Sequence, residues 1–293
     1  MQKAFRIALT AAAPHKTRMF LLGGSDFPND CATLHAALSE SLAPLGLDAT
    51  AVVLDGAFPS FAAMRVDLTG ALFHRGYRMP GASSPVKDGF FSRVLEIKAA
   101  PAKFESLPFS VSFRAGDCVF AFGNTAEGVR VGILQRCSGG TLEVAIRVAD
   151  IEASLLTIAN EAASGFGASV QSVRIVLDAE SPRRVAITAT TVAKALMTKA
   201  TLTLRGRLEV DDGFNARLSD ITCTGDGMIA NLAASQLRPR LAEWERVSFS
   251  LANALPEGLA ISDIALDAGP ELRARAGFHF AGAESQRPGV AKE

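Results

Sequence analysis

The chain has 293 residues, of which 48% are hydrophobic and 20% are charged, and this composition predicts a globular protein of one or two domains. Its 30 Lys and Arg side chains balance 30 Asp and Glu side chains, so it has no basic field for a phosphate backbone and no nucleic-acid partner is expected. No apolar run approaches the roughly 20 residues that a transmembrane helix needs.

Residues 1–28 form an N-terminal segment of uncertain role. Lys3 and Arg6 precede weakly hydrophobic residues over 7–13, an arrangement that imitates a signal peptide with a short hydrophobic region. About seven weakly hydrophobic residues make a poor signal peptide, so a cytoplasmic or peripheral-membrane location is slightly favoured over a periplasmic or exported one.

A first helix is predicted over residues 31–43. Asn29 or Asp30 supplies its N-cap, and Pro44 lies at its end. Its leucines share one stripe, which consists of Leu34, Leu38, Leu42 and Leu45.

Two later segments also have a helical period. The first begins at Asp150 as N-cap, runs to Ser164, and aligns Ile151, Leu155, Ile158 and Ala162. The second covers residues 227–243, where Pro239 is expected to kink or interrupt the helix. Its apolar stripe consists of Ile229, Leu232, Ala233, Leu237 and Leu241.

Alternation of apolar and polar residues dominates the rest of the chain and predicts strands with one apolar side. Short turns such as Asp211-Asp212-Gly213 and Ser138-Gly139-Gly140 suit antiparallel hairpins. The predicted strands cover residues 49–54, 64–73, 90–99, 107–113, 117–122, 128–135, 141–148, 169–178, 183–191, 201–210, 213–224, 246–251, 259–266 and 271–280.

The order of elements predicts an α+β protein with long antiparallel sheets and few helices. No internal linker marks a boundary, so residues 29–280 are expected to form a single domain, and residues 281–293 a flexible C-terminal tail.

Signatures of catalysis are absent from the sequence, which contains no nucleotide-binding loop, zinc-protease motif or hydrolase elbow. The four histidines, His15, His35, His74 and His279, are isolated from one another. We therefore predict a protein that is not an enzyme and has no metal or cofactor.

Four cysteines, Cys31, Cys118, Cys137 and Cys223, lack metal-ligand spacing and are interpreted as small buried hydrophobic residues. Three disulfide connectivities remain open for an oxidising compartment. Arg238, Arg240 and Arg246 follow one another near the third helix and are candidates for contact with a lipid headgroup or an anionic membrane surface.

The aromatic residues are unusual in kind, because 18 Phe accompany one Trp and one Tyr. Phe fills an apolar interior without needing a hydrogen-bond partner, whereas Tyr and Trp carry a polar group. The composition therefore favours dry apolar surface over polar recognition.

Two groups of motifs carry a resemblance to a known family. Near the front, the first helix is followed by Gly56-Ala57-Phe58-Pro59-Ser60-Phe61 and then by Met64-Arg65-Val66-Asp67-Leu68-Thr69-Gly70. Near the end come Gly225-Asp226-Gly227-Met228-Ile229-Ala230, Leu237-Arg238-Pro239-Arg240-Leu241, Phe249-Ser250-Leu251 and Leu255-Pro256-Glu257-Gly258-Leu259. In order and spacing these motifs resemble the tubular lipid-binding (TULIP) superfamily, and within it the bacterial LmeA-like phospholipid-binding family.

The resemblance implies an elongated half-barrel, in which a strongly curved antiparallel sheet wraps around amphipathic helices and leaves an apolar groove. It implies non-enzymatic binding, for transport, sensing or presentation, of a phospholipid or fatty-acyl ligand, with possible peripheral membrane contact. The predicted apolar lining consists of Leu34, Leu38, Leu42, Phe58, Phe61, Phe109, Val111, Phe113, Ile229, Leu232, Leu237 and Leu241.

Two alternatives remain open. A structural or assembly protein would fill the same sheet with its own side chains and dock a partner on an exposed face. An enzyme acting on a lipid or glycan would instead bring His35, His74 or His279 together with carboxylates and a serine at one opening.

Overall fold

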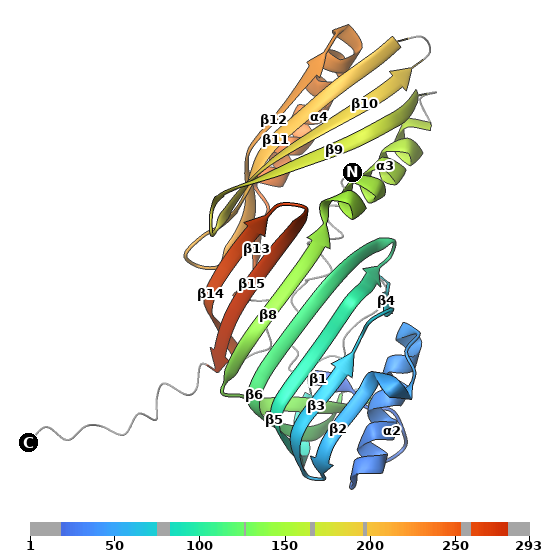
Figure 1. The fold of residues 1–293 in the computed structure, drawn as a ribbon, viewed down its shortest axis with the longest axis vertical. Helices are drawn as coiled ribbons and strands as arrows, with labels where there is room; N and C mark the ends of the chain where they lie inside the picture. The colour runs from blue at the N-terminus through green and yellow to red at the C-terminus, as the bar shows by residue number, and fades with distance from the viewer. Residues whose placement is uncertain are drawn as a thin grey trace, which may run out of the picture.

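The computed structural model describes residues 19–74, 83–125, 127–164, 168–195, 198–252 and 259–280. In this part of the chain two sheets follow one another along the long axis of the molecule, and α-helices flank them (Figure 1). The larger sheet has ten strands and the smaller sheet has five. The predicted α+β class, mostly strand with few helices, is confirmed. Of the predicted N-terminal segment, residues 19–21 form a strand, and the predicted C-terminal tail lies outside the described residues.

The larger sheet follows the order β14-β15-β8-β6-β5-β3-β2, with β4 beside β5, β7 beside β6 and β1 beside β7. Its described strands do not close into a barrel. These strands are β1 (Met19–Leu21), β2 (Val52–Ala57), β3 (Ser60–Asp67), β4 (Leu72–Phe73), β5 (Ser83–Phe104), β6 (Leu107–Thr125), β7 (Arg130–Arg136), β8 (Gly139–Arg147), β14 (Leu259–Ala268) and β15 (Glu271–Phe280).

Two pairs in the larger sheet contradict the prediction of a wholly antiparallel sheet. Both β3 and β4 pair with β5 in parallel. The chain leaves β3 at Asp67 and enters β5 only at Ser83, and this connection is long enough to return to the same end of the sheet, as a parallel pair requires. The larger sheet is therefore mixed.

The smaller sheet is antiparallel throughout and follows the order β13-β12-β11-β10-β9. It forms from the part of the chain between β8 and β14, so it is an insertion between two strands of the larger sheet. Its strands are β9 (Ala168–Ser181), β10 (Arg184–Ala195), β11 (Thr198–Val210), β12 (Asn215–Asp226) and β13 (Ser248–Ser250).

Helix α2 (Cys31–Leu42) confirms the first predicted helix. The Asp30 carboxylate accepts a hydrogen bond from the Thr33 N–H over 2.7 Å, and the Thr33 hydroxyl accepts one from the Asp30 N–H over 3.1 Å. This reciprocal capping box satisfies two N–H groups at the start of the helix. A 3-10 turn, η1 (Ala43–Leu45), continues the chain to Gly46, which has a left-handed conformation.

Helix α3 (Val148–Ser164) begins before Asp150, so the prediction that Asp150 caps it is wrong. The Asp150 carboxylate instead lies in the first turn and accepts two hydrogen bonds from the Arg147 guanidinium, over 2.7 and 3.1 Å. Its negative charge still favours this end of the helix through the helix dipole.

Helix α4 (Met228–Glu245) runs through Pro239, so the expected interruption does not occur. Proline removes one hydrogen bond from the helix. Ala234 and Leu241, on either side of Pro239, are both buried in one cluster with Cys223 of β12, and this packing holds the helix across the proline.

The predicted turns have different outcomes. Asp211-Asp212-Gly213 does join the hairpin β11–β12, where the Asp211 carboxylate accepts the Asn215 N–H over 2.8 Å. Ser138-Gly139-Gly140 is not a hairpin turn, because β7 and β8 both pair with β6, one after the other. These residues instead lie at an irregularity between two strands that continue the same antiparallel ladder.

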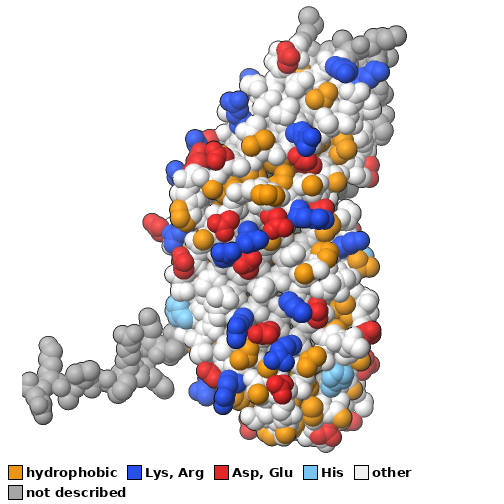
Figure 2. Space-filling model, viewed as in Figure 1, with side chains coloured by type: hydrophobic (Ala, Val, Ile, Leu, Met, Phe, Trp, Pro, Cys, Tyr) orange, Lys and Arg blue, Asp and Glu red, His pale blue; other side chains and the backbone are white. Residues whose placement is uncertain are grey.

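One face of the larger sheet is covered by charged side chains in cross-strand ion pairs (Figure 2). Glu96 on β5 lies 3.4 Å from Arg65 on β3 and 3.5 Å from Arg114 on β6, and Glu143 on β8 lies 2.9 Å from Arg275 on β15. Exposed pairs of this kind contribute little stability individually. Their alternating signs spread the balanced charge over this face.

The two sheets meet in an apolar cluster that includes the C-terminal hairpin. Ile264 and Leu266 on β14 are buried together with Val185 on β10 and Val210 on β11. The Leu266 N–H also donates a hydrogen bond to the Pro182 carbonyl over 2.6 Å. The hairpin β14–β15 is therefore part of the larger sheet and also part of the contact with the smaller one.

Candidate functional site

The structure separates the predicted apolar lining into clusters that belong to different parts of the fold. Leu34, Leu38 and Phe61 are buried in the main core of the larger sheet, with Leu42, Phe58 and Phe113 against it. Phe109 and Val111 pack, again with Leu42, against a separate small cluster of buried residues, which consists of Leu45, Ala71, Ala99 and Ala102.

The predicted residues of α4 lie against the smaller sheet. Leu241 is buried and Leu237 is half-buried, and both belong to the cluster with Cys223. Leu232 is 62% exposed, and the side chain of Ile229 lies outside the described residues. Together, the positions of the predicted lining residues do not define one continuous lining.

Phenylalanine rings fill the core of the larger sheet. Phe90 stacks on Phe120 with 4.6 Å between ring centroids, and Phe20 and Phe61 approach this pair edge-on. Phe61 is 1% exposed and Phe122 is fully buried. The high Phe content of the sequence is thus used here in closed packing, where ring pairs stabilise beyond their buried area.

The smaller sheet has an apolar face that is covered less completely. Cross-strand register aligns Ile175 with Ala189 and Leu204, and Leu177 with Ile187, so these side chains share one face. Ile175, Leu177, Ile187 and Leu204 are all half-buried. We define the apolar face as Val173, Ile175, Leu177, Val185, Ile187, Ala189, Leu204 and Leu208. One end of it, with the fully buried Val185, packs against the cluster between the two sheets, and Leu204 packs against α4, so the open part lies around Ile175.

Helix α3 lies along β9, at one edge of this sheet (Figure 1). Its apolar stripe, Ile151, Leu155 and Ile158, is half-buried. Among the described side chains of α3, none is fully buried. An amphipathic helix normally buries its stripe, so the apolar stripe of α3 is covered only in part.

Polar side chains of α3 hold the helix against the edge of β9. The Glu152 carboxylate accepts the Ile175 N–H over 2.7 Å, and the Asn160 amide makes two hydrogen bonds with the backbone of Val170. These bonds satisfy backbone groups of an edge strand that would otherwise pair with another chain.

Helix α4 covers part of the same sheet, above β11 and β12, and brings positive charge close to the apolar face. Arg238 is exposed, yet its guanidinium is close enough to the buried Cys223 to lower the pKa of that thiol, although burial has the larger effect and raises it. Arg246 is exposed at the C-terminal end of α4, and the side chain of Arg240 lies outside the described residues.

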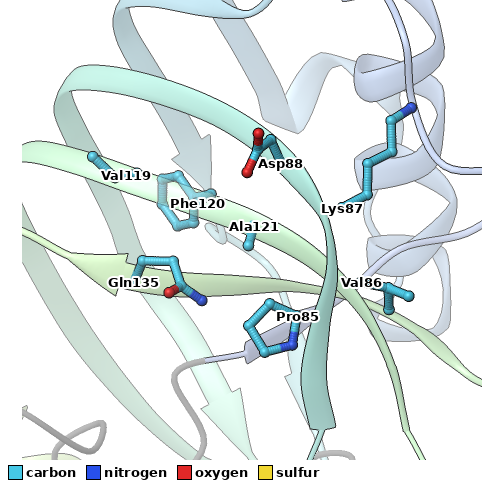
Figure 3. A pocket seen from close by; sticks show the side chains of 8 residues that line it. All are labelled: Pro85, Val86, Lys87, Asp88, Val119, Phe120, Ala121 and Gln135. Carbon is cyan, nitrogen blue, oxygen red and sulfur yellow. The ribbon is translucent and has the colours of Figure 1, made fainter.

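Two surface hollows lie against the larger sheet. The larger, of about 670 Å³, lies between β5, β6 and β7 and is lined by Lys87, Asp88, Phe120 and Gln135 among others (Figure 3). The Lys87 side chain extends away from Gln135. The second hollow, of about 280 Å³, is bordered by the Arg147–Asp150 ion pair.

The histidine alternative gains no support from the described residues. His35 on α2 lies with Nε2 3.1 Å from the Val52 carbonyl oxygen, while His74 follows β4 and His279 lies in β15. No group of three His, Cys, Asp or Glu side chains suited to a metal ion occurs in the described part of the chain. None of its helices combines the length and apolarity that spanning a membrane requires.

Sequence reasoning missed Ile175, Leu177 and Ile187 as candidate site residues. Their alternation within residues 169–178 and 183–191 was visible and predicted strands. The local pattern did not reveal that their shared face would be covered only in part, because that depends on where α3 and α4 lie.

Comparisons of the chain with protein families, with curated proteins and with solved structures found no match, so they assign it to no family.

Proposed function

We propose that this protein binds an anionic amphiphile without catalysis, on the apolar face of the smaller sheet between α3 and α4. The observation that carries the proposal is the incomplete cover of this face around the half-buried Ile175 on β9, beyond the parts that pack against the cluster between the sheets and against α4. Helix α3, which is held along β9, carries a second apolar stripe that is only half-buried. Contiguous apolar surface of this kind marks binding sites in soluble proteins.

The chemistry of the surface favours an acyl chain over a polar ligand. Its members are aliphatic and offer no side-chain hydrogen bond. Each methylene removed from water contributes about 0.8 kcal/mol, so a chain of about 12 carbons supplies up to about 10 kcal/mol before the costs of ordering it. The exposed Arg238 on α4 carries the positive charge with which a carboxylate or phosphate headgroup would pair.

The proposal keeps the ligand class that the family resemblance implies but moves the site. Leu34, Leu38 and Phe61 are assigned to packing in the larger sheet, because they are buried against neighbouring side chains. Leu237 and Leu241, which also belong to the predicted apolar lining, border the proposed site because they pack in the cluster that contains Cys223 of β12.

An assembly role is the second candidate, and the closed core of the larger sheet favours it. In that case the apolar face and the stripe of α3 would be covered by another protein surface. Two measurements distinguish the candidates: extraction of the purified protein detects a bound amphiphile, and the oligomeric state in solution detects assembly.

The decisive experiment measures lipid content and fatty-acid binding of the full chain. Natively purified protein is extracted with organic solvent for mass spectrometry, and a dansyl-labelled fatty acid is titrated by fluorescence. Ile175→Gln is expected to weaken binding at least tenfold, because it places an amide on the apolar face. Val176→Gln is the matched control, since Val176 is the next residue, lies on the opposite face and is 64% exposed.

The headgroup part of the proposal has its own pair of variants. Arg238→Gln is expected to weaken binding of the dansyl fatty acid but not of its uncharged methyl ester, whereas Arg205→Gln, on the opposite face of β11, leaves both unchanged. Protein that yields no extracted amphiphile and does not bind the probe contradicts the proposal. A self-association that Ile175→Gln abolishes would support the assembly role instead.

A further inference from the structure

Two of the four cysteines are neighbours across the ladder between β6 and the strands that follow it. Cys118 lies in β6, and Cys137 lies between β7 and β8. The residues on either side are in register, because Val119 pairs with Arg136 and Gly116 pairs with Gly139. Cys118 and Cys137 are therefore the next opposing residues after Val119 and Arg136.

The two side chains also share one face of the ladder. The pair Phe120–Leu134 precedes the register shift and lies in the main core. Cys118 and Cys137, on the other side of the shift, lie in the same core. Cys118 is fully buried and Cys137 is 5% exposed, both in the main core of the larger sheet. Residues that oppose each other in an antiparallel ladder and are buried on the same side place their Cβ atoms close together.

This arrangement meets the general geometry of a disulfide. Opposing residues of antiparallel strands have Cα atoms about 4.5 to 5.5 Å apart, within the range of about 4.4 to 6.8 Å that disulfides show. The two thiols also interact electrostatically. The pKa of Cys118 is raised to about 12, mainly by burial and to a smaller extent by the nearby Cys137.

The other cysteines lie elsewhere in the fold. Cys31 is half-buried on α2, and Cys223 is buried on β12 of the smaller sheet, against α4. Of the connectivities that four cysteines permit, the register favours one bond, between Cys118 and Cys137.

We propose that Cys118 and Cys137 are an oxidisable pair that forms an intramolecular disulfide when the chain meets a disulfide oxidant such as oxidised glutathione. One cysteine thiolate attacks a glutathione sulfur and expels glutathione thiolate, which leaves a mixed disulfide. The second cysteine thiolate attacks the protein sulfur of that mixed disulfide, forms the S–S bond and expels the second glutathione thiolate. The two protons lost by the cysteines end on two glutathione molecules, so the protein loses two electrons and the oxidant gains them.

Burial controls the rate of this reaction. A thiol with a raised pKa supplies little thiolate at neutral pH and is a slow nucleophile. The bond is therefore expected to form quickly during folding, when the strands are still open, and slowly in the native chain. Once formed, the bond ties the segment between β7 and β8 to β6. It also closes a loop of about 20 residues, which lowers the entropy of the unfolded chain and so stabilises the fold.

The test compares two routes to the oxidised protein with the full chain. In one arm native reduced protein is incubated with oxidised glutathione, and in the other the denatured reduced chain refolds in a glutathione buffer. Remaining thiols are alkylated under denaturing conditions, and intact mass and non-reduced peptide mapping follow. Two of the four cysteines are expected to escape alkylation because they are joined in a disulfide, and peptide mapping is expected to place that bond between Cys118 and Cys137. The bond is expected to form more slowly in the native arm.

Variants keep the result interpretable. The double variant Cys31→Ala/Cys223→Ala retains only the proposed pair and is expected to form the same link. Its oxidised form is expected to have a higher midpoint of thermal unfolding than its reduced form, and adding a reductant should remove this difference. Cys118→Ser and Cys137→Ser are expected to lose the link. Four free thiols in both arms, or a mapped link between any other pair, overturns the proposal, and the native arm decides the matter if the denatured chain does not refold.

Discussion

The side-chain amide of Asn160 on α3 pairs with the backbone of Val170 on β9. Its Nδ2 donates to the Val170 carbonyl over 2.9 Å, and its Oδ1 accepts the Val170 N–H over 2.8 Å. The amide thus replaces part of a neighbouring strand at the open edge of the smaller sheet.

Replacing Asn160 with Leu removes both hydrogen bonds and leaves the Val170 backbone groups without these partners. Val170 is half-buried, so each lost hydrogen bond is expected to cost its net contribution of about 0.5 to 1.5 kcal/mol. We expect a fall of this size in the free energy of unfolding in urea, together with faster hydrogen exchange at the Val170 amide. Thr157→Ala, on the exposed side of the same helix, is the control, and equal exchange rates in the two variants would show that Asn160 does not hold this edge.

Leu34→Ala tests whether the predicted groove residues form closed core. Leu34 is fully buried, so truncation leaves a cavity and is expected to cost about 2 to 5 kcal/mol in urea unfolding. Leu232→Ala, at a predicted lining position that is 62% exposed, is expected to change stability by less than about 0.5 kcal/mol. A Leu34→Ala variant of unchanged stability would contradict the assignment of this residue to the core.

Gly225→Ala tests the close approach of β12 and α4. A methyl group at Gly225 would meet the backbone of Ala230, which cannot move without shifting the helix. Overpacking of this kind costs about 1 to 3 kcal/mol. Gly269→Ala is the matched control, because the space around Gly269 is open. Thermal unfolding of the two variants should therefore differ, with the lower midpoint in Gly225→Ala.

The cap of α2 predicts a contribution to acid sensitivity. Hydrogen bonds from Thr33, the backbone N–H foremost, hold the pKa of Asp30 below its ordinary value. A lowered pKa in the folded state stabilises the protein above the ordinary pKa of Asp, and this contribution is lost as the pH falls through the folded value. Urea midpoints measured below about pH 4 should fall more steeply in the natural chain than in Asp30→Asn, which keeps an acceptor but does not titrate there. Parallel curves would exclude this role for Asp30.

Local signals predicted the helices well where the side chains act on their own backbone. Asp30 and Thr33 fix the start of α2, and the prediction there is confirmed. Asp150 carries the same kind of signal, but its carboxylate pairs with Arg147, and the helix begins earlier. At Asp150 the carboxylate therefore serves an ion pair within the first turn and does not mark the helix boundary.

Strand positions were predictable and their partners were not. The apolar positions at Phe109 and Phe113 alternate as expected, yet the two rings pack against different clusters. Residues 107–113 and 117–122 were predicted as two strands, whereas β6 continues through Asp117, which has a φ of 48°. Partner choice, including the parallel pairing of β3 with β5, depends on contacts between distant residues that no local period encodes.

Because β15 pairs with β8, the ladder of the larger sheet joins residues from opposite sides of the inserted smaller sheet. On the ribosome, all strands of the smaller sheet emerge before β15 is available. That sheet can therefore assemble early, while β8 waits with one side unpaired for a late partner. Closing such long-range pairs carries a large entropic cost and slows folding, so the pairing of β15 with β8 is expected to form after the smaller sheet.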